Sequence, residues 1–433
     1  MRYDDDYREA LHRLSVVDDS DWAMSRRQIL KAALAAGGAS VALGAGIGLG
    51  GGAAGAATVG GNLLLIQLAG GNDGFDMFPP TTGKLAQLYQ AYRGDIAITN
   101  AIPARVSGGR PSGFGFNPAM PYVASRYKAG RVAVVRGVGY PNASLSHFEA
   151  IGVWMVGSGA TGPATAGGWI GRWLDSFAKP GLVDAVQIGS SVPLHMQGTT
   201  RKASSIDVWE PDFGTSTDES EQLMYTALRG YSAQANARGP LADRFAGATK
   251  SMMSINQSVK PLYTTPTALP GEDIVAKLTL AARIFNAGLG VRVISTIQGD
   301  YDHHSGEPAK HAETLKALDD GLKAFFTGLS PAMRNRTTAM TFSEFGRKAH
   351  SNDSHGTDHG RASHLLVMGE KVRGGMVGNH PKLDGLDTWD DAEPTVDFRS
   401  VYSTVVKNWL KGNPATVVGG SFPKLALFRS GPS

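Results

Sequence analysis

The chain has 433 residues, of which 42% are hydrophobic and 18% are charged, and its formal net charge at pH 7 is +4. This length suffices for one large domain or two of ordinary size, and the composition favours a packed core over a disordered chain. The absence of cysteine excludes disulfides, thiolate metal ligands and a cysteine nucleophile. The small net charge, without a block of basic residues and interleaved aromatics, predicts no nucleic-acid partner.

Residues 1–57 have the features of an export signal, so we separate them from the fold. Ser25–Lys31 (SRRQILK) resembles a twin-arginine signal, and a weakly apolar Ala/Gly-rich run and a small-x-small cleavage pattern at 54–56 follow it. The run never reaches 18 strongly apolar residues, so we expect no stable membrane span after processing. The sequence therefore predicts recognition by the twin-arginine export machinery and a periplasmic or extracellular location, with Met24 as an alternative start to Met1.

Residues 58–433 are expected to form a single α/β domain. Apolar runs predict buried strands at residues 62–68, 131–138, 183–188, 291–297, 338–342 and 365–368. Helical periodicity predicts helices at residues 85–92, 121–129, 168–175, 274–287 and 311–326. Residues 198–275 are polar and poor in strand signal, with helical pieces near 219–229 and 241–256, which indicates a helical insertion or lid.

Ligand-type side chains follow several of these strands. Asp73 follows strand 62–68, Asp302 and His304 follow strand 291–297, and Glu344 follows strand 338–342. His359 precedes the last predicted strand. In open α/β sheets ligands bind at the strand ends, and carboxylate with imidazole suits a divalent cation. These five residues are therefore the predicted metal ligands, although an Asp beside Gly, as at position 73, is also a common turn residue.

A strand-to-helix turn at residues 139–149 contains the candidate nucleophile. Ser146 and Glu149 have the spacing of a capping box, which predicts a helix that begins at Ser146. A hydroxyl at a helix N-terminus is also well placed for attack on an anionic group, and the two roles are compatible. Asn142, Ser144 and His147 are the other candidates on this turn.

The carboxyl-terminal region predicts one further helix, which ends near Trp409. Asp397 and Arg399 precede or begin it. They either support the site or cap and pair at the helix start, and we favour capping.

The order of motifs from residue 60 to 412 resembles a known family. The motifs are LLLIQLAGGNDG, GRVAVVRGVGYPNASLSHF, GDYDHH, TFSEFGR, GTDHG and VDFRSVYSTVVKNWL. They are similar to the exported bacterial proteins called domain of unknown function 1501, which are grouped with the alkaline phosphatase and sulfatase superfamily. The resemblance implies a central, mostly parallel sheet with helices on both faces and a metal site at the carboxyl ends of the strands.

The resemblance also implies roles for individual residues. Asp73 matches the early metal-binding Asp of the superfamily, and Asp302 and His304 match its later Asp/His pair. Glu344 falls at the position of a strand-end Asp, and His359 at that of a more distal His. Two departures stand out: Phe345 replaces an expected His, and the nucleophile turn has no clear match.

The resulting hypothesis is an exported metal-dependent hydrolase of phosphate or sulfate esters with one or two Zn, Mn or Ca ions. Ser146 would attack, and Asp358 would orient His359 or act as a base. Asn72, Arg347 and Arg361 would hold a small anionic ester or a glycan substrate. The alternative is a non-catalytic binding protein on a degenerate hydrolase fold, in which the same residues form a structural metal site.

Overall fold

The computed structural model describes most of the chain after the predicted signal. The described residues are 60–105, 109, 111–158, 167–177, 183–201, 203–209, 218–233, 240–271 and 273–429. The predicted twin-arginine segment 1–57 and its cleavage site lie outside them. No helix among the described residues has the length and apolar character needed to cross a membrane.

The predicted first strand lies in the middle of the central sheet. β1 (Asn62–Leu68) pairs in parallel with β7 (Val293–Gln298) on one side and with β8 (Thr337–Phe342) on the other. Every residue of β1 is buried, as expected for an apolar run with both faces covered. The carboxyl ends of these three strands therefore lie side by side at one edge of the sheet.

The sheet extends on both sides of this trio. Beyond β7, the parallel strands β5 (Ala185–Ile188) and β6 (Ser204–Ile206) follow in that order. Beyond β8, β11 (Ser363–Gly369) runs antiparallel to both β8 and β4 (Val132–Gly139). Two short strands pair in parallel with β4, namely β12 (Gly375–Val377) and β13 (Val396–Asp397).

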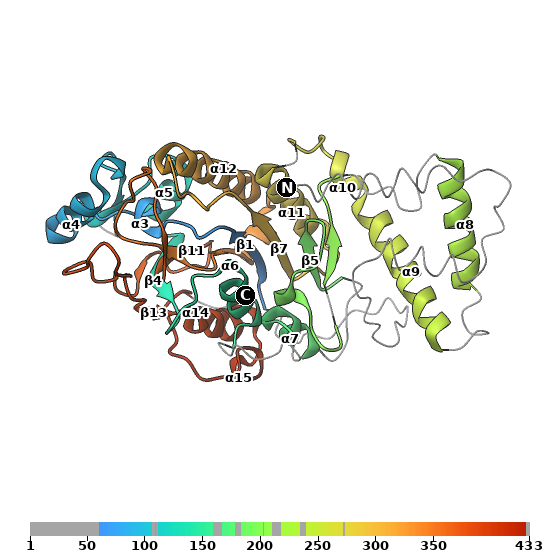
Figure 1. The fold of residues 1–433 in the computed structure, drawn as a ribbon. Helices are drawn as coiled ribbons and strands as arrows, with labels where there is room; N and C mark the ends of the chain where they lie inside the picture. Colours follow the sequence, from blue (N-terminus) through green and yellow to red (C-terminus); the bar gives the residue numbers. More distant parts are fainter. Residues whose placement is uncertain are drawn as a thin grey trace, which may run out of the picture. The chain divides into compact units, whose positions relative to one another are not determined.

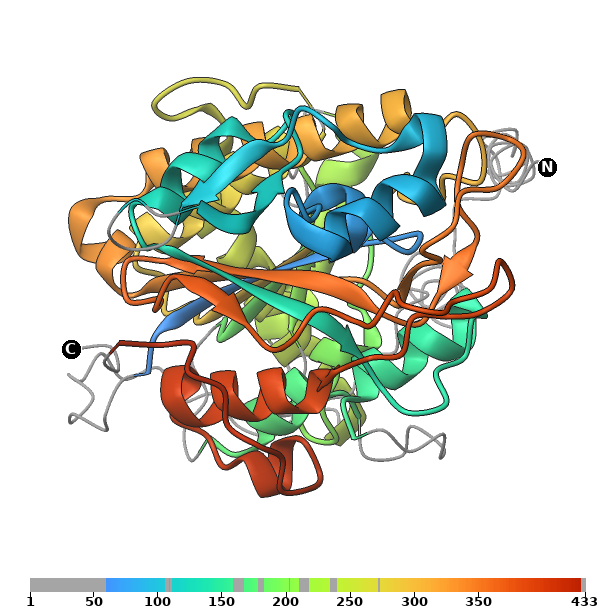
Figure 2. The same cartoon turned by 90° about the vertical axis from the view of Figure 1, so that its left-hand side faces the viewer.

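The described part of the chain thus forms a mixed, mostly parallel sheet of nine strands, in which β11 runs against its neighbours. Helices cover both of its faces (Figures 1 and 2). This arrangement confirms the predicted α/β fold class.

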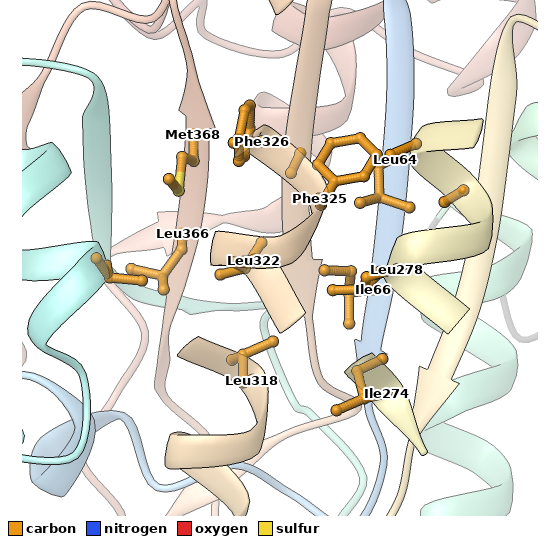
Figure 3. Packing of buried hydrophobic residues seen from close by; sticks show 14 of the residues in the cluster. Leu64, Ile66, Ile274, Leu278, Leu318, Leu322, Phe325, Phe326, Leu366 and Met368 are labelled. Atoms are coloured by element: carbon orange, nitrogen blue, oxygen red, sulfur yellow. The ribbon is translucent and has the colours of Figure 1, made fainter. Parts of the chain in front are cut away.

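One face of the sheet packs against three helices. They are α5 (Pro121–Lys128), α11 (Ile274–Asn286) and α12 (Glu307–Gly328). Leu64 and Ile66 of β1 point to this side and pack with buried side chains such as Leu318 and Phe325 (Figure 3). The alternating residues Leu63 and Leu65 belong to the core on the other face, as the two-residue period of a strand requires.

The second face is covered by helices from two parts of the chain. These are α6 (His147–Val156), α7 (Trp169–Asp175), α14 (Phe398–Thr404) with its π-helical continuation Val405–Leu410, and α15 (Pro414–Val417). Asp397 is the N-cap of α14: its carboxylate accepts from the Arg399 amide and pairs with the Arg399 side chain. The predicted capping role of Asp397 is confirmed.

The remaining described elements surround this core. Near the start of the domain are α3 (Gly74–Met77), α4 (Gly83–Arg93), the 3-10 turn Gly94–Ile96 and the hairpin of β2 (Ile102–Arg105) with β3 (Pro111–Phe116). Two short helical segments lie further along, the 3-10 turn Leu194–Met196 and α13 (Pro331–Asn335).

The predicted insertion 198–275 contains more than helices. It holds α8 (Glu219–Ala233), α9 (Pro240–Val259) and α10 (Pro261–Thr264). It also holds β6, which pairs with β5 in the central sheet. The sequence analysis missed this strand because it is only three residues long and half-buried, so it carries little apolar signal. The helical part of the segment starts after β6.

Candidate metal centre

The loops that leave β1, β7 and β8 meet at one edge of the sheet. The register pairs Leu68 with Gln298 and Gln67 with Phe342, so the three strands end almost level. After β8 the chain forms a small antiparallel ladder of β9 (Gly346–Arg347) and β10 (His359–Gly360) before it enters β11. This ladder returns His359 to the edge where Asp302 and His304 follow β7.

Four side chains converge there, and we call them the histidine cluster: His147, Asp302, His304 and His359. His359 Nε2 lies 3.1 Å from Asp302 Oδ1 and 3.0 Å from His304 Nε2. His304 Nε2 is itself 3.1 Å from Asp302 Oδ1, and His147 Nε2 is 3.5 Å from Asp302 Oδ2. His147, Asp302 and His359 meet the spacing expected of ligands to one metal ion. The side chains are 20% to 46% exposed, so the cluster is open to solvent.

Hydrogen bonds on the outer side of two rings fix which nitrogen carries the proton. His359 Nδ1 is 3.0 Å from the carbonyl oxygen of Leu145, which only accepts, so Nδ1 donates. His147 Nδ1 is 2.9 Å from Glu344 Oε1, which also accepts from the Gly70 amide at 2.8 Å. In the neutral rings Nε2 is therefore left as an electron-pair donor that faces the cluster.

The third ring follows the same arrangement. His304 Nδ1 is 3.4 Å from Asp358 Oδ1, a longer contact that nevertheless directs Nε2 inward. With the protons on Nδ1, three imidazole Nε2 atoms face the Asp302 carboxylate as electron-pair donors; His147, Asp302 and His359 meet the mutual spacing of metal ligands, and His304 lies beside the last two. Such a set repels itself unless a proton or a cation lies at its centre, and outward Nδ1–H bonds to carboxylate or carbonyl are the usual support of metal-bound histidines.

The surroundings of two cluster members, Asp302 and His359, favour the protonation states that bind a metal ion. Burial opposes ionisation of Asp302, but the hydrogen bond and the positive charge of Arg347 outweigh it and lower the pKa of Asp302 to about 2. Burial also lowers the pKa of His359, which favours the neutral imidazole. A carboxylate and neutral imidazoles are the protonation states that bind a divalent ion, so the residues fit such an ion.

The floor of the cluster is apolar. The buried Phe345 ring packs against His147 and His359, with centroids 4.7 Å and 4.4 Å away. Phe345 stands where the resemblance led us to expect a further ligand. It supports the two imidazoles instead.

The Gly70–Gly71 turn allows the close approach of the strand-end loops. A Cβ on Gly70 would lie 2.5 Å from the Asp302 amide, and one on Gly71 would lie 2.4 Å from the Phe345 ring. Both residues also have φ in the left-handed region, which favours glycine.

A second group of acids, which we call the buried acidic group, consists of Asp73, Asp76 and Glu307. Asp73 caps α3 through the amides of residues 75 and 76, and its other oxygen contacts Arg93. Arg93 Nη1 is also 3.4 Å from Asp76 Oδ1, and Tyr89 donates to the same oxygen at 2.7 Å. These acids and Arg93 are all at most 1% exposed.

The acids of this group differ in ionisation. Burial raises the pKa of Asp73, but Arg93 outweighs it and holds the value at about 2. Burial raises the pKa of Asp76 to about 7. Burial and the neighbouring Asp73 charge raise the pKa of Glu307 well above its usual range. Arg93 therefore provides the counter-charge for Asp73, and the other two acids hold protons at acidic pH.

Two predicted ligands take other positions in the structure. Asp73 belongs to the buried acidic group, because Arg93 and the α3 amides engage both of its oxygens. Glu344 lies behind His147 and accepts from its Nδ1 and from the Gly70 amide. Its position suits orientation of His147 better than direct ligation. Asp302, His304 and His359 remain predicted ligands.

The three residues predicted to hold an anion are all engaged elsewhere. Asn72 is fully buried, and its Oδ1 is 3.1 Å from His311 Nε2. Arg347 is buried beneath the cluster, where it donates to Asp302 and to four backbone carbonyls, those of residues 70, 71, 301 and 357. Arg361 pairs with Asp391 at 3.2 Å and with Glu393 at 2.6 Å. These contacts give all three side chains other partners, and their predicted role in substrate binding stays a prediction.

Two further predictions concern Ser146 and Asp358. Ser146 is the exposed N-cap of α6, as predicted, but its side chain makes no capping bond. Ser144 bonds Glu149 at 2.7 Å and the Ser146 amide at 3.1 Å instead. The Ser146 hydroxyl thus makes no helix-capping hydrogen bond, and Ser146 directly precedes His147. Asp358 was predicted to orient His359 or to act as a base; it contacts His304, and its role as a base stays a prediction.

His147 is the cluster member that the sequence analysis left among the alternatives. The turn after β4 contains two serines beside His147, and the capping-box spacing of Ser146 and Glu149 predicts a helix start without any role for His147. One signal could have identified His147. Like His304 after β7 and His359 in the β9–β10 ladder, it is a histidine on a segment that follows or precedes a predicted strand.

Comparison with known proteins places most of this site within a described family. Residues 214–408 match the family model described as "Protein of unknown function (DUF1501)". Over this region the chain is similar to the DUF1501 family. The DUF1501 region contains Asp302, His304 and His359, whereas His147 precedes it. A search of curated proteins finds no match.

Solved structures resemble the chain at low sequence identity. A protein of the alkaline phosphatase superfamily from Vibrio parahaemolyticus is 8% identical with a TM-score of 0.38, covering 82% of this chain and 70% of that chain. The lipoteichoic acid synthase LtaP from Listeria monocytogenes is 8% identical with a TM-score of 0.34, covering 78% and 74%. The 2-O GAG sulfatase BT1596 is 11% identical with a TM-score of 0.33, covering 84% and 72%.

Proposed function

We propose that the histidine cluster binds one divalent transition metal and that the protein hydrolyses phosphate or sulfate esters there. The observation that supports this most directly is the convergence of three imidazole Nε2 atoms and one carboxylate, each 3.0 to 3.5 Å from another member of the cluster. The cluster is open to solvent at the carboxyl edge of the sheet, where an α/β protein usually places its ligand.

The donor set narrows the choice of metal. Three imidazoles and one carboxylate suit Zn²⁺ or Mn²⁺, whereas Ca²⁺ prefers oxygen ligands. Asp73 and Glu344, which a second ion would have needed, are engaged with Arg93 and His147. A single ion is therefore the better proposal.

The chain's own residues would prepare the reaction around that ion. A bound ion supplies Lewis-acid polarisation of the ester oxygens. Glu344 and Asp358 hold the His147 and His304 rings, and Arg347 holds Asp302 in its ionised state. Ser146 beside His147 is the proposed nucleophile, with water as the alternative attacking group.

The proposed setting is outside the cytoplasm. The twin-arginine pattern at residues 25–31 supports export of the folded protein by the twin-arginine machinery to the periplasm or beyond. The proposed substrate is a small anionic ester or an ester carried on a glycan.

One observation favours a non-catalytic alternative. Asn72 and Arg361 are engaged with His311 and with Asp391 and Glu393, and the buried Arg347 already bonds Asp302 of the cluster, so the side chains predicted to hold the anion all have other partners. In this alternative the metal stabilises the edge of the sheet, and the protein binds a glycan or a partner protein without turnover.

The test is metal content by mass spectrometry with turnover on a panel of phosphate and sulfate esters. The variants are His147→Ala, His304→Ala and His359→Ala, and the control is His355→Ala, an exposed histidine that pairs with Asp95. We expect one Zn or Mn per chain in wild type and control, and loss of the metal and of turnover in the three cluster variants. Ser146→Ala should keep the metal and lose turnover.

Each outcome separates the candidates. Metal retained in all three cluster variants would reject the proposed centre. Metal present with no ester turned over would favour the structural alternative. Full turnover in Ser146→Ala would leave the centre in place and assign the attack to water.

A further inference from the structure

Two large aromatic side chains are strongly exposed on segments connected to the histidine cluster. Phe148 directly follows His147 at the start of α6 and is 90% exposed. Trp389 is 80% exposed and lies in the segment between β12 and β13. Burial of such a ring is favourable, so an aromatic side chain held in water beside a ligand site is a candidate contact for the ligand.

Trp389 is held in place by the ladder that carries His359. The Lys348 ammonium lies 5.5 Å from the centroid of the indole ring and donates to the Trp389 carbonyl at 3.1 Å. Lys348 directly follows β9, and its amide donates to the carbonyl of Asp358 at 2.9 Å. One face of the indole is thus under the ammonium, and the exposure of the side chain leaves the other face open.

A second set of contacts joins the segment between β12 and β13, which contains Trp389, to the residue that follows β10. Arg361, which follows β10, pairs with Asp391 and Glu393. Within the segment, the Asp387 amide donates to Asp390 at 2.8 Å. An exposed ring held in one orientation loses little conformational freedom when a ligand stacks on it, which favours binding.

The charges beside Trp389 narrow the kind of ligand. Asp387 and Asp390 are both exposed next to the ring. Carboxylates accept hydrogen bonds from hydroxyl groups, and an indole face packs against the C–H face of a sugar ring. The same carboxylates repel an anionic membrane surface and a chain that carries many sulfates.

We propose that Trp389, together with Phe148, forms a stacking subsite for a neutral sugar ring. The substrate class would then be a mostly uncharged saccharide with an isolated phosphate or sulfate ester, and the ester would lie at the histidine cluster. The ester part of this proposal rests on the proposed function, whereas sugar binding at Trp389 does not.

The test measures binding of unesterified sugars to the metal-free protein, so it involves no turnover. Cellohexaose and agarohexaose are titrated by calorimetry against wild type, Trp389→Ala, Phe148→Ala and the control Trp209→Ala, which removes another exposed tryptophan. We expect one neutral hexasaccharide to bind, with affinity reduced roughly three- to tenfold in Trp389→Ala and unchanged in Trp209→Ala. Phe148→Ala should give a smaller loss.

Three results would overturn the subsite. They are no binding of either hexasaccharide, equal affinity in Trp389→Ala and wild type, and tighter Trp389-dependent binding of a heparin hexasaccharide or of phosphatidylglycerol vesicles. Thermal unfolding of each variant checks that the exposed substitutions leave the fold intact. Because ester turnover is measured separately, failure of the hydrolase proposal leaves this result interpretable.

Discussion

Glu344 is buried behind His147, where one of its oxygens accepts from both the imidazole and the Gly70 amide. This position makes the carboxylate responsible for the orientation of the ring and for the proton on Nδ1. Metal affinity should depend on it although it does not touch the ion, because outer hydrogen-bond partners raise the basicity of a ligating imidazole.

We expect Glu344→Gln to weaken metal binding by about 10- to 100-fold and to leave the stoichiometry at one. The amide keeps the size of the side chain and loses its charge. Competition with a chelator measures the affinity, and Glu313→Gln, on the exposed side of α12, is the matched control. Equal affinities in the two variants would show that Glu344 has no orienting role.

Individual residues also show what the sequence could not supply. Asp302, His304 and His359 were predicted because each adjoins a strand whose apolar run is unmistakable. The role of Asp73 depends on Arg93, twenty positions later, whose guanidinium returns to it only in the folded chain. The burial of Arg347 could not be predicted either, because its carbonyl partners come from three separate segments.

Among the elements, the turn between β1 and α3 has the strictest steric requirement. Gly71 has a φ of 82° and would place a Cβ 2.4 Å from the Phe345 ring. Phe345 in turn supports His147 and His359. A methyl group at position 71 should therefore displace the floor of the metal centre.

We expect Gly71→Ala to destabilise the fold by roughly 1–3 kcal/mol and to weaken metal binding as well. Gly299→Ala is the control, because its Cβ would meet no atom within 4 Å and its φ is ordinary. Denaturant unfolding and metal titration measure the two effects. If Gly71→Ala matches wild type in both stability and metal affinity, the Phe345 ring shifts to accommodate the methyl group without loss of free energy.

The predicted strands agree best with the structure where the run of apolar residues is long. The runs at residues 62–68 and 338–342 became β1 and β8 within a residue, since strands buried on both faces are almost wholly apolar. The edge strands β6 and β12 have three half-buried residues each and gave no comparable pattern. Pairing with a neighbour, which sequence alone does not show, is what defines them.

At the scale of the whole molecule, buried titratable groups make stability depend on pH. Burial lowers the pKa of several histidines, to about 3 for His195, His311 and His364 and to about 4 for His380. Each contributes stability that is present above its unfolded pKa near 6.5 and is lost as the pH falls through the folded value. Asp76 and Glu307, whose pKa values are raised, act in the opposite direction.

With His303, whose pKa is also lowered to about 4, five such histidines outnumber the four acids with raised pKa values (Asp76, Glu307, Asp319 and Asp391), so the free energy of unfolding should fall as the pH is lowered from 7 to 4. Asp76 contributes stability below pH 4 that is lost as the pH rises to about 7. Asp76→Asn cannot ionise at this position. As the pH rises from 4 to 7, the variant should therefore become more stable relative to wild type. Denaturant unfolding at pH 4, 5, 6, 7 and 8 measures both trends.

The control for this series is Asp384→Asn, at an exposed position paired with Lys84. Its difference from wild type should stay constant across the series. A difference between Asp76→Asn and wild type that is also constant would show that Asp76 is ionised throughout the range.

The reversed direction of β11 has a consequence for how this protein could be altered. Because β8 and β11 are antiparallel neighbours, the connection formed by residues 343–362 leaves β8 and enters β11 at the same end of the sheet. No crossover helix must be rebuilt when that connection is exchanged. The loop at residues 343–362 could therefore be replaced by a loop from another protein. The replacement would supply His359 and new residues around the site, while β8 and β11 stay unchanged.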